Sequence, residues 1–319
     1  ASRWKVLMPL DTTQNIERVE FISLIAMMFA TVAFSIDAML PALPQIADEI
    51  ADGQPAHAAW ILTTFVAGMG LGTFFVGALS DAFGRKPIIY AGAALYIASA
   101  AAAWATSSLE WMLVARFAQG LGASGPRIVA LAIVRDLYSG REMARIMAIA
   151  MSVFILVPAI SPALGALIIM QFGWRGIFAA FIIFSAITVL WVWARLNEPL
   201  PVEKRRPMRF NLMLSAVKEV LTHKTAALSI GVQTLMTGMV FATLVTIQPI
   251  YDQIYGRADS FPFWVGLVAL MSGCSSLLNA AIVTRFGMRK VVTYALISQI
   301  TIAGGILIIM TATNTHNFY

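Results

Sequence analysis

The sequence predicts an all-α integral membrane protein. Of its 319 residues, 59% are apolar and only 12% are charged, about half the charged fraction of a soluble domain. The apolar residues gather into runs of about 20, the length that crosses a bilayer as a helix, and most Lys and Arg residues lie between these runs. A mean hydropathy of +0.80 excludes soluble domains and disordered chains, which need many more charges.

Nine runs meet the length and hydropathy expected of spanning helices. They cover residues 21–43, 58–80, 88–106, 111–134, 146–170, 174–194, 225–250, 263–284 and 291–313. Six precede the only long polar connection and three follow it. We therefore expect an N-terminal six-helix bundle over residues 1–194, a cytoplasmic linker over 195–224, and a partial C-terminal bundle, spans seven to nine, over 225–319.

The basic residues predict the orientation. If the N-terminus is cytoplasmic, 18 of the 22 Lys and Arg residues fall in inside stretches and only Arg175 and Arg257 fall outside. This bias follows the positive-inside rule, so we expect a multi-pass protein of the cytoplasmic (inner) membrane with its N-terminus inside. The net charge of +6 then reports topology, and no nucleic-acid partner is expected, because such a partner needs a basic face on a folded domain.

The linker has two features of its own. Three prolines and the run Lys204-Arg205-Arg206 predict a solvated segment near anionic headgroups. Apolar residues at near-helical spacing between positions 212 and 221 predict a short interfacial helix.

Two similar turns indicate an internal repeat. Phe83-Gly84-Arg85-Lys86-Pro87-Ile88 follows the second span, and Phe286-Gly287-Met288-Arg289-Lys290-Val291 follows the eighth. Each is a tight basic turn, second in its half, so the pair indicates duplicated halves joined by the linker.

Several motifs resemble those of the major facilitator superfamily. The stretch Gly77-Ala-Leu-Ser-Asp81-Ala-Phe-Gly84-Arg85-Lys86-Pro87 is similar to its G-x-x-x-D-x-x-G-R-[RK] loop. Arg116-Phe-Ala-Gln119-Gly120 is similar to the R-x-x-Q-G motif of its proton-coupled exporters. Residues 36–44 and 133–137 resemble the Bcr/CflA-type drug:proton antiporters. The resemblance implies a major-facilitator fold with a six-helix N-terminal half and a partial, three-helix C-terminal half.

The chain departs from that pattern in three places. The family has twelve spans, and because residues 317–319 resemble the start of another span, we expect the native chain to continue. The span-five motif is matched only in part, by Pro158, Pro162 and Gly165 with Ala166 at the second glycine. The family often has an aromatic residue shortly after the aspartate of the first span, whereas here Ala38 and Met39 follow Asp37.

Charged side chains inside spans are costly and therefore candidate functional groups. Asp37 and Arg116 lie at similar depth in the outer half of the membrane. The resemblance implies that Asp37 accepts a proton or a cationic substrate and that Arg116 tunes it. The alternatives are a static ion pair, or an arginine that caps carbonyls. Gln119 is a candidate substrate contact or an interhelical hydrogen bond.

Arg127 directly follows Ser124-Gly125-Pro126 in the fourth span. It could bind an anionic substrate, or it could satisfy the backbone carbonyls that a proline leaves free. Both interpretations stay open.

The loop of Gly77, Asp81, Gly84, Arg85 and Lys86 is, by resemblance, a conformational latch on the cytoplasmic side. Asp81 would accept hydrogen bonds at a neighbouring helix N-terminus or pair with Arg85. Its second copy has Ala281 at the aspartate position, so that latch is degraded. The prolines of span five predict a kink, although helix packing would use the same residues.

No nucleophile–base pair indicates an enzyme, and His57, His223 and His316 lack metal-ligand spacing, so we expect no catalytic residue, metal or cofactor. The resemblance implies a secondary active transporter that exports small amphipathic drugs by alternating access, with the proton gradient as its energy source. Alternatives are a metabolite or anion transporter of the same fold, or a non-transporting subunit or assembly factor of a larger membrane complex. The partners that we expect are a small-molecule substrate and the lipid bilayer. We expect the protein to be a monomer, with partner subunits if the native chain is this short.

Overall fold

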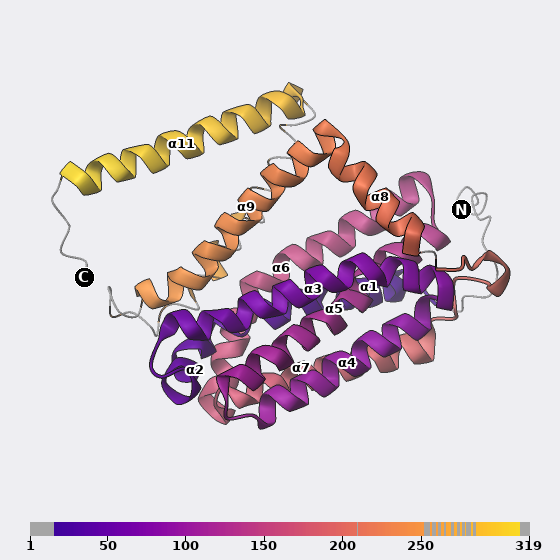
Figure 1. The fold of residues 1–319 in the computed structure, drawn as a ribbon, viewed down its shortest axis with the longest axis horizontal. Coiled ribbons are helices and arrows are strands. Elements are labelled where there is room, and N and C mark those ends of the chain that lie inside the picture. The colour runs from indigo at the N-terminus through magenta and orange to yellow at the C-terminus, as the bar shows by residue number, and fades with distance from the viewer. Residues whose placement is uncertain are drawn as a thin grey trace, which may run out of the picture.

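A computed structural model describes residues 16–208, 210–251 and 285–312, with short stretches between 256 and 282. All the regular structure assigned within them is helical (Figure 1). Eight segments are long and apolar enough to cross a membrane, which confirms the all-α membrane fold. The eighth predicted span, 263–284, lies largely outside the described residues.

The helices follow one another through short connections. In the first half they are α1 (Arg18–Asp37), η1 (Leu40–Ala42), α2 (Leu43–Ile50), α3 (Pro55–Phe83), α4 (Arg85–Ala105), α5 (Leu109–Leu137), α6 (Gly140–Phe172) and α7 (Arg175–Arg195). After these come η2 (Val202–Lys204), α8 (Phe210–Thr222), α9 (Lys224–Pro249) and α11 (Met288–Ala312). Helix α8 covers the segment for which the sequence predicts a short helix.

Helix α5 packs between α3 and α4 in the N-terminal bundle. Glycines allow this close approach: a Cβ atom on Gly120 would lie 2.0 Å from the carbonyl oxygen of Phe65 in α3. A Cβ atom on Gly122 would lie 2.6 Å from the carbonyl oxygen of Gly92 in α4. The backbones of three helices therefore touch along α5, as small residues permit inside membranes.

The first span differs from its prediction. A single helix was expected over 21–43, but α1 ends at Asp37, and the chain continues through η1 and α2 to Ile50. Pro41 lies in η1 and Pro44 near the start of α2, and proline cannot donate to the helical ladder. Hydropathy alone misses such a break, because the residues on both sides of it are equally apolar.

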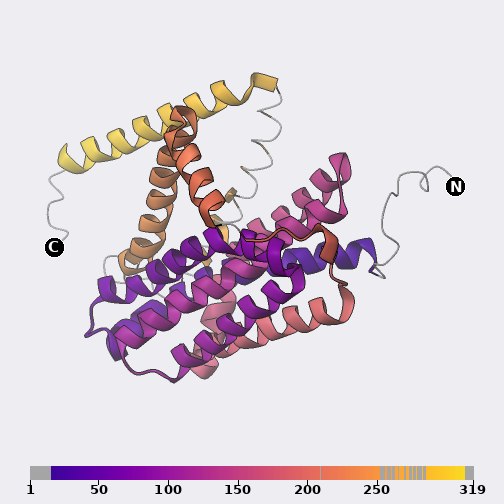
Figure 2. The same cartoon turned by 45° about the vertical axis from the view of Figure 1, so that its right-hand side comes forward.

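The second half is more loosely attached to the bundle. Figure 2 shows α8, α9 and α11 standing away from it, with the C-terminal end of α9 returning to its surface. There Phe241, Leu244 and Ile247 pack against the cluster formed around η1. Most of the remaining length of α9 is exposed, and its residues 229–238 lie across a cavity from α3.

Candidate functional site

Asp37 is the last residue of α1 and lies at the break in the first span. It is only 7% exposed, and among the described residues its carboxylate accepts no hydrogen bond and forms no ion pair. The structure therefore places an unpartnered carboxylate inside the bundle.

Arg116 reaches the same break from α5 and is fully buried. It donates to the Ser35 carbonyl from Nη2 (3.1 Å), to the Ile61 carbonyl from Nε (3.3 Å), and to Gln119 Oε1 from Nη1 (2.7 Å). The Ser35 carbonyl is open because the Met39 N–H, its usual helical partner, bonds to Ile36 instead. Arg116 thus caps the C-terminal end of α1, where a cation is favourable.

This geometry decides between the two structural alternatives for Arg116. The arginine caps carbonyls, and the described side chains form no Asp37–Arg116 ion pair. Its guanidinium also lies 4.4 Å from the ring centroid of Phe65, an arrangement that partly compensates for its burial.

Two further side chains at the break were not among the sequence candidates. The Tyr96 hydroxyl of α4 lies 2.5 Å from Ser35 Oγ, which itself donates to the Thr31 carbonyl at 2.6 Å. Because the Ser35 proton is used there, Tyr96 donates to Ser35. Next to them, Gln119 Nε2 is buried without a partner among the described residues. A tyrosine within an apolar span was the available signal, since its hydroxyl must find a partner there.

Gly165 of α6 lies against the residue that follows Asp37. A Cβ atom on Gly165 would be 2.3 Å from the Ala38 carbonyl oxygen, so close packing accounts for this glycine. Pro158 and Pro162 lie inside α6, and the helix is continuous through both.

Arg127 stands apart from this group. It is half-buried, and its Nη1 lies 3.8 Å from the Met69 sulfur. The predicted hydrogen bonds to carbonyls freed by Pro126 are not formed within the described residues. Its role as an anion-binding group stays a prediction.

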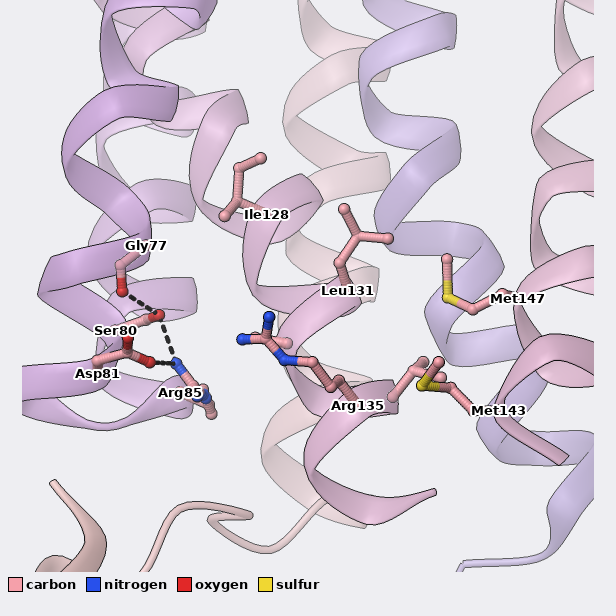
Figure 3. Close-up of a pocket in the computed structure, with 11 residues that line it drawn as sticks. Gly77, Ser80, Asp81, Arg85, Ile128, Leu131, Arg135, Met143 and Met147 are labelled. Carbon is pink, nitrogen blue, oxygen red and sulfur yellow. Dashed lines mark hydrogen bonds and ion pairs between the residues drawn. The ribbon is translucent and has the colours of Figure 1, made fainter. Parts of the chain in front are cut away.

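The opposite end of the bundle holds the predicted latch loop. Arg85 is 3% exposed and donates to Asp81 Oδ1 (2.6 Å), Asp136 Oδ2 (2.7 Å) and Ser80 Oγ (2.7 Å). Figure 3 shows the bonds to Asp81 and Ser80 at the edge of a cavity of about 430 Å³. Asp81 therefore pairs with Arg85 and not with a helix N-terminus. Asp136, at the end of α5, completes the arrangement.

Glu198, in the linker, caps the N-terminus of α4 instead. Its carboxylate accepts from the backbone N–H groups of Arg85 (2.8 Å) and Lys86 (2.9 Å), the first residues of α4. In return, Lys86 Nζ donates to the Leu196 carbonyl beyond the end of α7 (2.5 Å). The two helices thus cap each other with charges that suit their dipoles. The sequence offered no signal for this contact, because the partners lie more than 100 residues apart.

The glycines of the loop have different roles. Gly84 adopts φ +104°, which requires glycine, and Gly287 in the second basic turn adopts φ +82°. This shared backbone conformation supports the repeat. A Cβ atom on Gly77 would meet no atom within 4 Å, so packing does not require glycine there. Ala281 lies outside the described residues.

Replacing Glu198 with glutamine is expected to lower the free energy of unfolding by about 1 kcal/mol, because the neutral amide caps α4 less well than a carboxylate. Unfolding in SDS, followed by tryptophan fluorescence, measures the change. Glu203→Gln is the matched control, since Glu203 is exposed in the same linker. Equal losses in the two variants would contradict a capping role.

A cavity of about 840 Å³ lies between α3 and α9. Its walls combine hydroxyl and amide groups (Thr63, Gln233 and Thr237) with the apolar surfaces of Val66 and Phe241. No cluster of His, Cys, Asp or Glu suited to a metal ion occurs in the part of the chain that the structure describes.

Comparison with known proteins finds relatives named for drug resistance. The chain is 30% identical over 286 residues to a bicyclomycin resistance protein homolog of Haemophilus influenzae, covering 88% of this chain and 70% of that protein. It is 38% identical over 149 residues to a chloramphenicol resistance protein of Pseudomonas aeruginosa, covering 46% of this chain and 35% of that one.

Solved structures show the same fold. The human organic anion transporter MFSD10 (TETRAN) superimposes with a TM-score of 0.61 at 19% identity, covering 80% of this chain and 70% of that one. The family model of the Major Facilitator Superfamily matches residues 24–319. With this match and the two basic turns, the chain belongs to the Major Facilitator Superfamily.

Proposed function

We propose that this transporter exports small amphipathic drugs in exchange for protons by alternating access. The observation that carries the proposal is Asp37, a carboxylate inside a span with no partner among the described residues. An ionised carboxylate is costly in that position, whereas a protonated one is not. A group of this kind can carry a proton when the site is closed and release it when water reaches it.

The surroundings of Asp37 support a coupled site. Asp37 lies at a helix break, a feature that transporters use to build ion and substrate sites. Arg116 holds the Ser35 carbonyl, two residues before Asp37, so a movement of α1 against α5 changes the distance between carboxylate and guanidinium. In the proposed cycle Asp37 is neutral while the site is closed to water. It loses its proton to the cytoplasm as the drug is captured there, and it is protonated again from the outside as the drug is released.

The proposed substrate class rests on the cavity between α3 and α9. Its hydroxyl, amide and aromatic groups match molecules with both polar and apolar surfaces. The relatives named for bicyclomycin and chloramphenicol resistance favour drug export in this chain as well. The placement of basic residues favours a cytoplasmic N-terminus in the inner membrane.

Replacing Asp37 with asparagine is expected to reduce drug-driven proton movement at least about tenfold, because an amide cannot exchange a proton in this pH range. Purified protein in liposomes with an internal pH dye measures proton movement on drug addition. Asp48→Asn, at an exposed position of α2, is the matched control. Coupling that survives Asp37→Asn unchanged would sink the mechanism.

A second candidate is transport of an anionic metabolite by the same fold. Arg127 favours it, because the Met69 sulfur is the only hydrogen-bond partner of its half-buried guanidinium among the described residues. Thermal-shift screening of cationic drugs against small carboxylates separates the two. Stabilisation by carboxylates, lost in Arg127→Gln, would support the second candidate, and stabilisation by cations alone would defeat it.

A further inference from the structure

The end of the bundle opposite Asp37 carries a basic pocket that is separate from the proposed proton and drug sites. It has a volume of about 710 Å³ and lies between the ends of α3 and α5 and linker residues 200–206. Three carboxylates line it. The basic side chains that line it number five: Arg85, Arg135, Lys204, Arg205 and Arg206. The pocket therefore has an excess of positive charge.

Most of this charge is available to a ligand. Asp81 and Asp136 are both engaged by Arg85, which leaves Glu203 as the remaining carboxylate. Arg135, Lys204 and Arg206 form no ion pair with the described residues. Arg205 Nε is buried and has no hydrogen-bond partner among them.

The linker that carries these cations is held in place. The Arg206 N–H donates to the Asp81 carbonyl at 3.0 Å, and the Lys204 N–H donates to the Pro201 carbonyl at 3.0 Å. Glu198 fixes the preceding residues to α4. An anion that binds here meets cations already in position, which lowers the entropic cost of binding.

An apolar cavity adjoins the basic pocket. It has a volume of about 430 Å³ and shares Asp81, Arg85 and Arg135 with it. In Figure 3, the Arg135 guanidinium extends from α5 toward Arg85, while Leu131, Met143 and Met147 line the other side. A ligand that fills both spaces carries an anionic group and an apolar chain.

Helix α8 directly follows the linker and has exposed apolar side chains. Its Leu214 and Leu221 are 65% and 55% exposed, and its main contact is with α9. A short amphipathic helix with an uncovered apolar face is suited to lie in the headgroup layer. The linker residues of the basic pocket end only a few residues before this helix.

We infer that the basic pocket binds the phosphate of an anionic phospholipid, with an acyl chain in the adjoining apolar cavity. The planar guanidinium of arginine donates two parallel hydrogen bonds to phosphate oxygens. Basic residues close to a membrane surface also attract anionic headgroups. The bound lipid joins α3, α5 and the linker at the latch loop.

Native mass spectrometry of the delipidated full chain tests this inference with phosphatidylglycerol and phosphatidylcholine as probes. The wild type is expected to retain phosphatidylglycerol in preference to phosphatidylcholine. Lys204→Gln/Arg206→Gln is expected to bind phosphatidylglycerol about thirtyfold more weakly, the factor for two lost charges at about 1 kcal/mol each. Both residues are exposed, so the variant keeps its fold.

The matched control is Arg289→Gln/Lys290→Gln, which removes the same charge from the second basic turn and is expected to bind like the wild type. Equal loss in both double variants would overturn the site, because net charge alone would then explain binding. Equal retention of the two lipids would also overturn it. Displacement of phosphatidylglycerol by millimolar inorganic phosphate would show that the acyl chain contributes nothing and would overturn the lipid assignment.

Discussion

Replacing Arg85 with alanine is expected to lower the free energy of unfolding by about 3 kcal/mol. The guanidinium is buried and holds Asp81, Asp136 and Ser80 together, so its loss leaves two carboxylates facing each other without a cation. Breaking a buried pair on one side costs about 3–5 kcal/mol. We expect the lower end of this range, because the Asp81 side chain is 43% exposed and water screens its charge.

SDS-induced unfolding, followed by tryptophan fluorescence, measures this loss. Arg135→Ala is the matched control, because Arg135 is exposed on the neighbouring helix end and is expected to change stability by less than about 0.5 kcal/mol. Arg85→Lys is expected to recover only part of the loss, since one ammonium cannot serve three acceptors on different sides. A similar small effect of Arg85→Ala and Arg135→Ala would mean that the three-residue arrangement does not support the bundle.

The spans could be predicted because bilayer thickness fixes the length of an apolar helix. The break at Asp37 could not, since Leu40, Ala42 and Leu43 are as apolar as the helix before them, and only the two prolines hint at it. The turn at Gly84 was predicted from its repetition at Gly287, and positive φ at both explains why each copy keeps glycine.

The sequence named the candidate residues of the site but not the contacts between them. Sequence marked Asp37 and Arg116 because charges within spans are rare, yet their relation depends on a carbonyl left open by the helix break. Likewise, the latch loop was visible as a motif, whereas Glu198 caps α4 from far along the chain. Contacts of this kind follow from how α4 and α7 pack, which no local pattern records.

Replacing Arg116 with alanine is expected to lower the free energy of unfolding by about 4 kcal/mol, whereas Arg116→Met lowers it by about 1–2 kcal/mol. Alanine leaves a cavity and removes every hydrogen bond of a fully buried side chain. Methionine fills most of the space and removes the cost of burying a charge, so the loss is confined to three acceptors that no longer have this donor: the Ser35 and Ile61 carbonyls and the Gln119 amide oxygen. Arg127→Met, at a half-buried guanidinium of the same helix, is the control and is expected to cost less than about 1 kcal/mol.

The methionine variant also separates the capping of α1 by Arg116 from its proposed role in transport. Because it folds, its proton movement in liposomes reports what the charge does beyond holding α1. We expect drug-driven proton movement to fall by about tenfold or more. In the proposed mechanism a cation approaches Asp37 when α1 moves and stabilises its ionised carboxylate inside the bilayer. Full coupling in Arg116→Met would reduce Arg116 to a helix cap, and Asp37 would then have to exchange its proton with water alone.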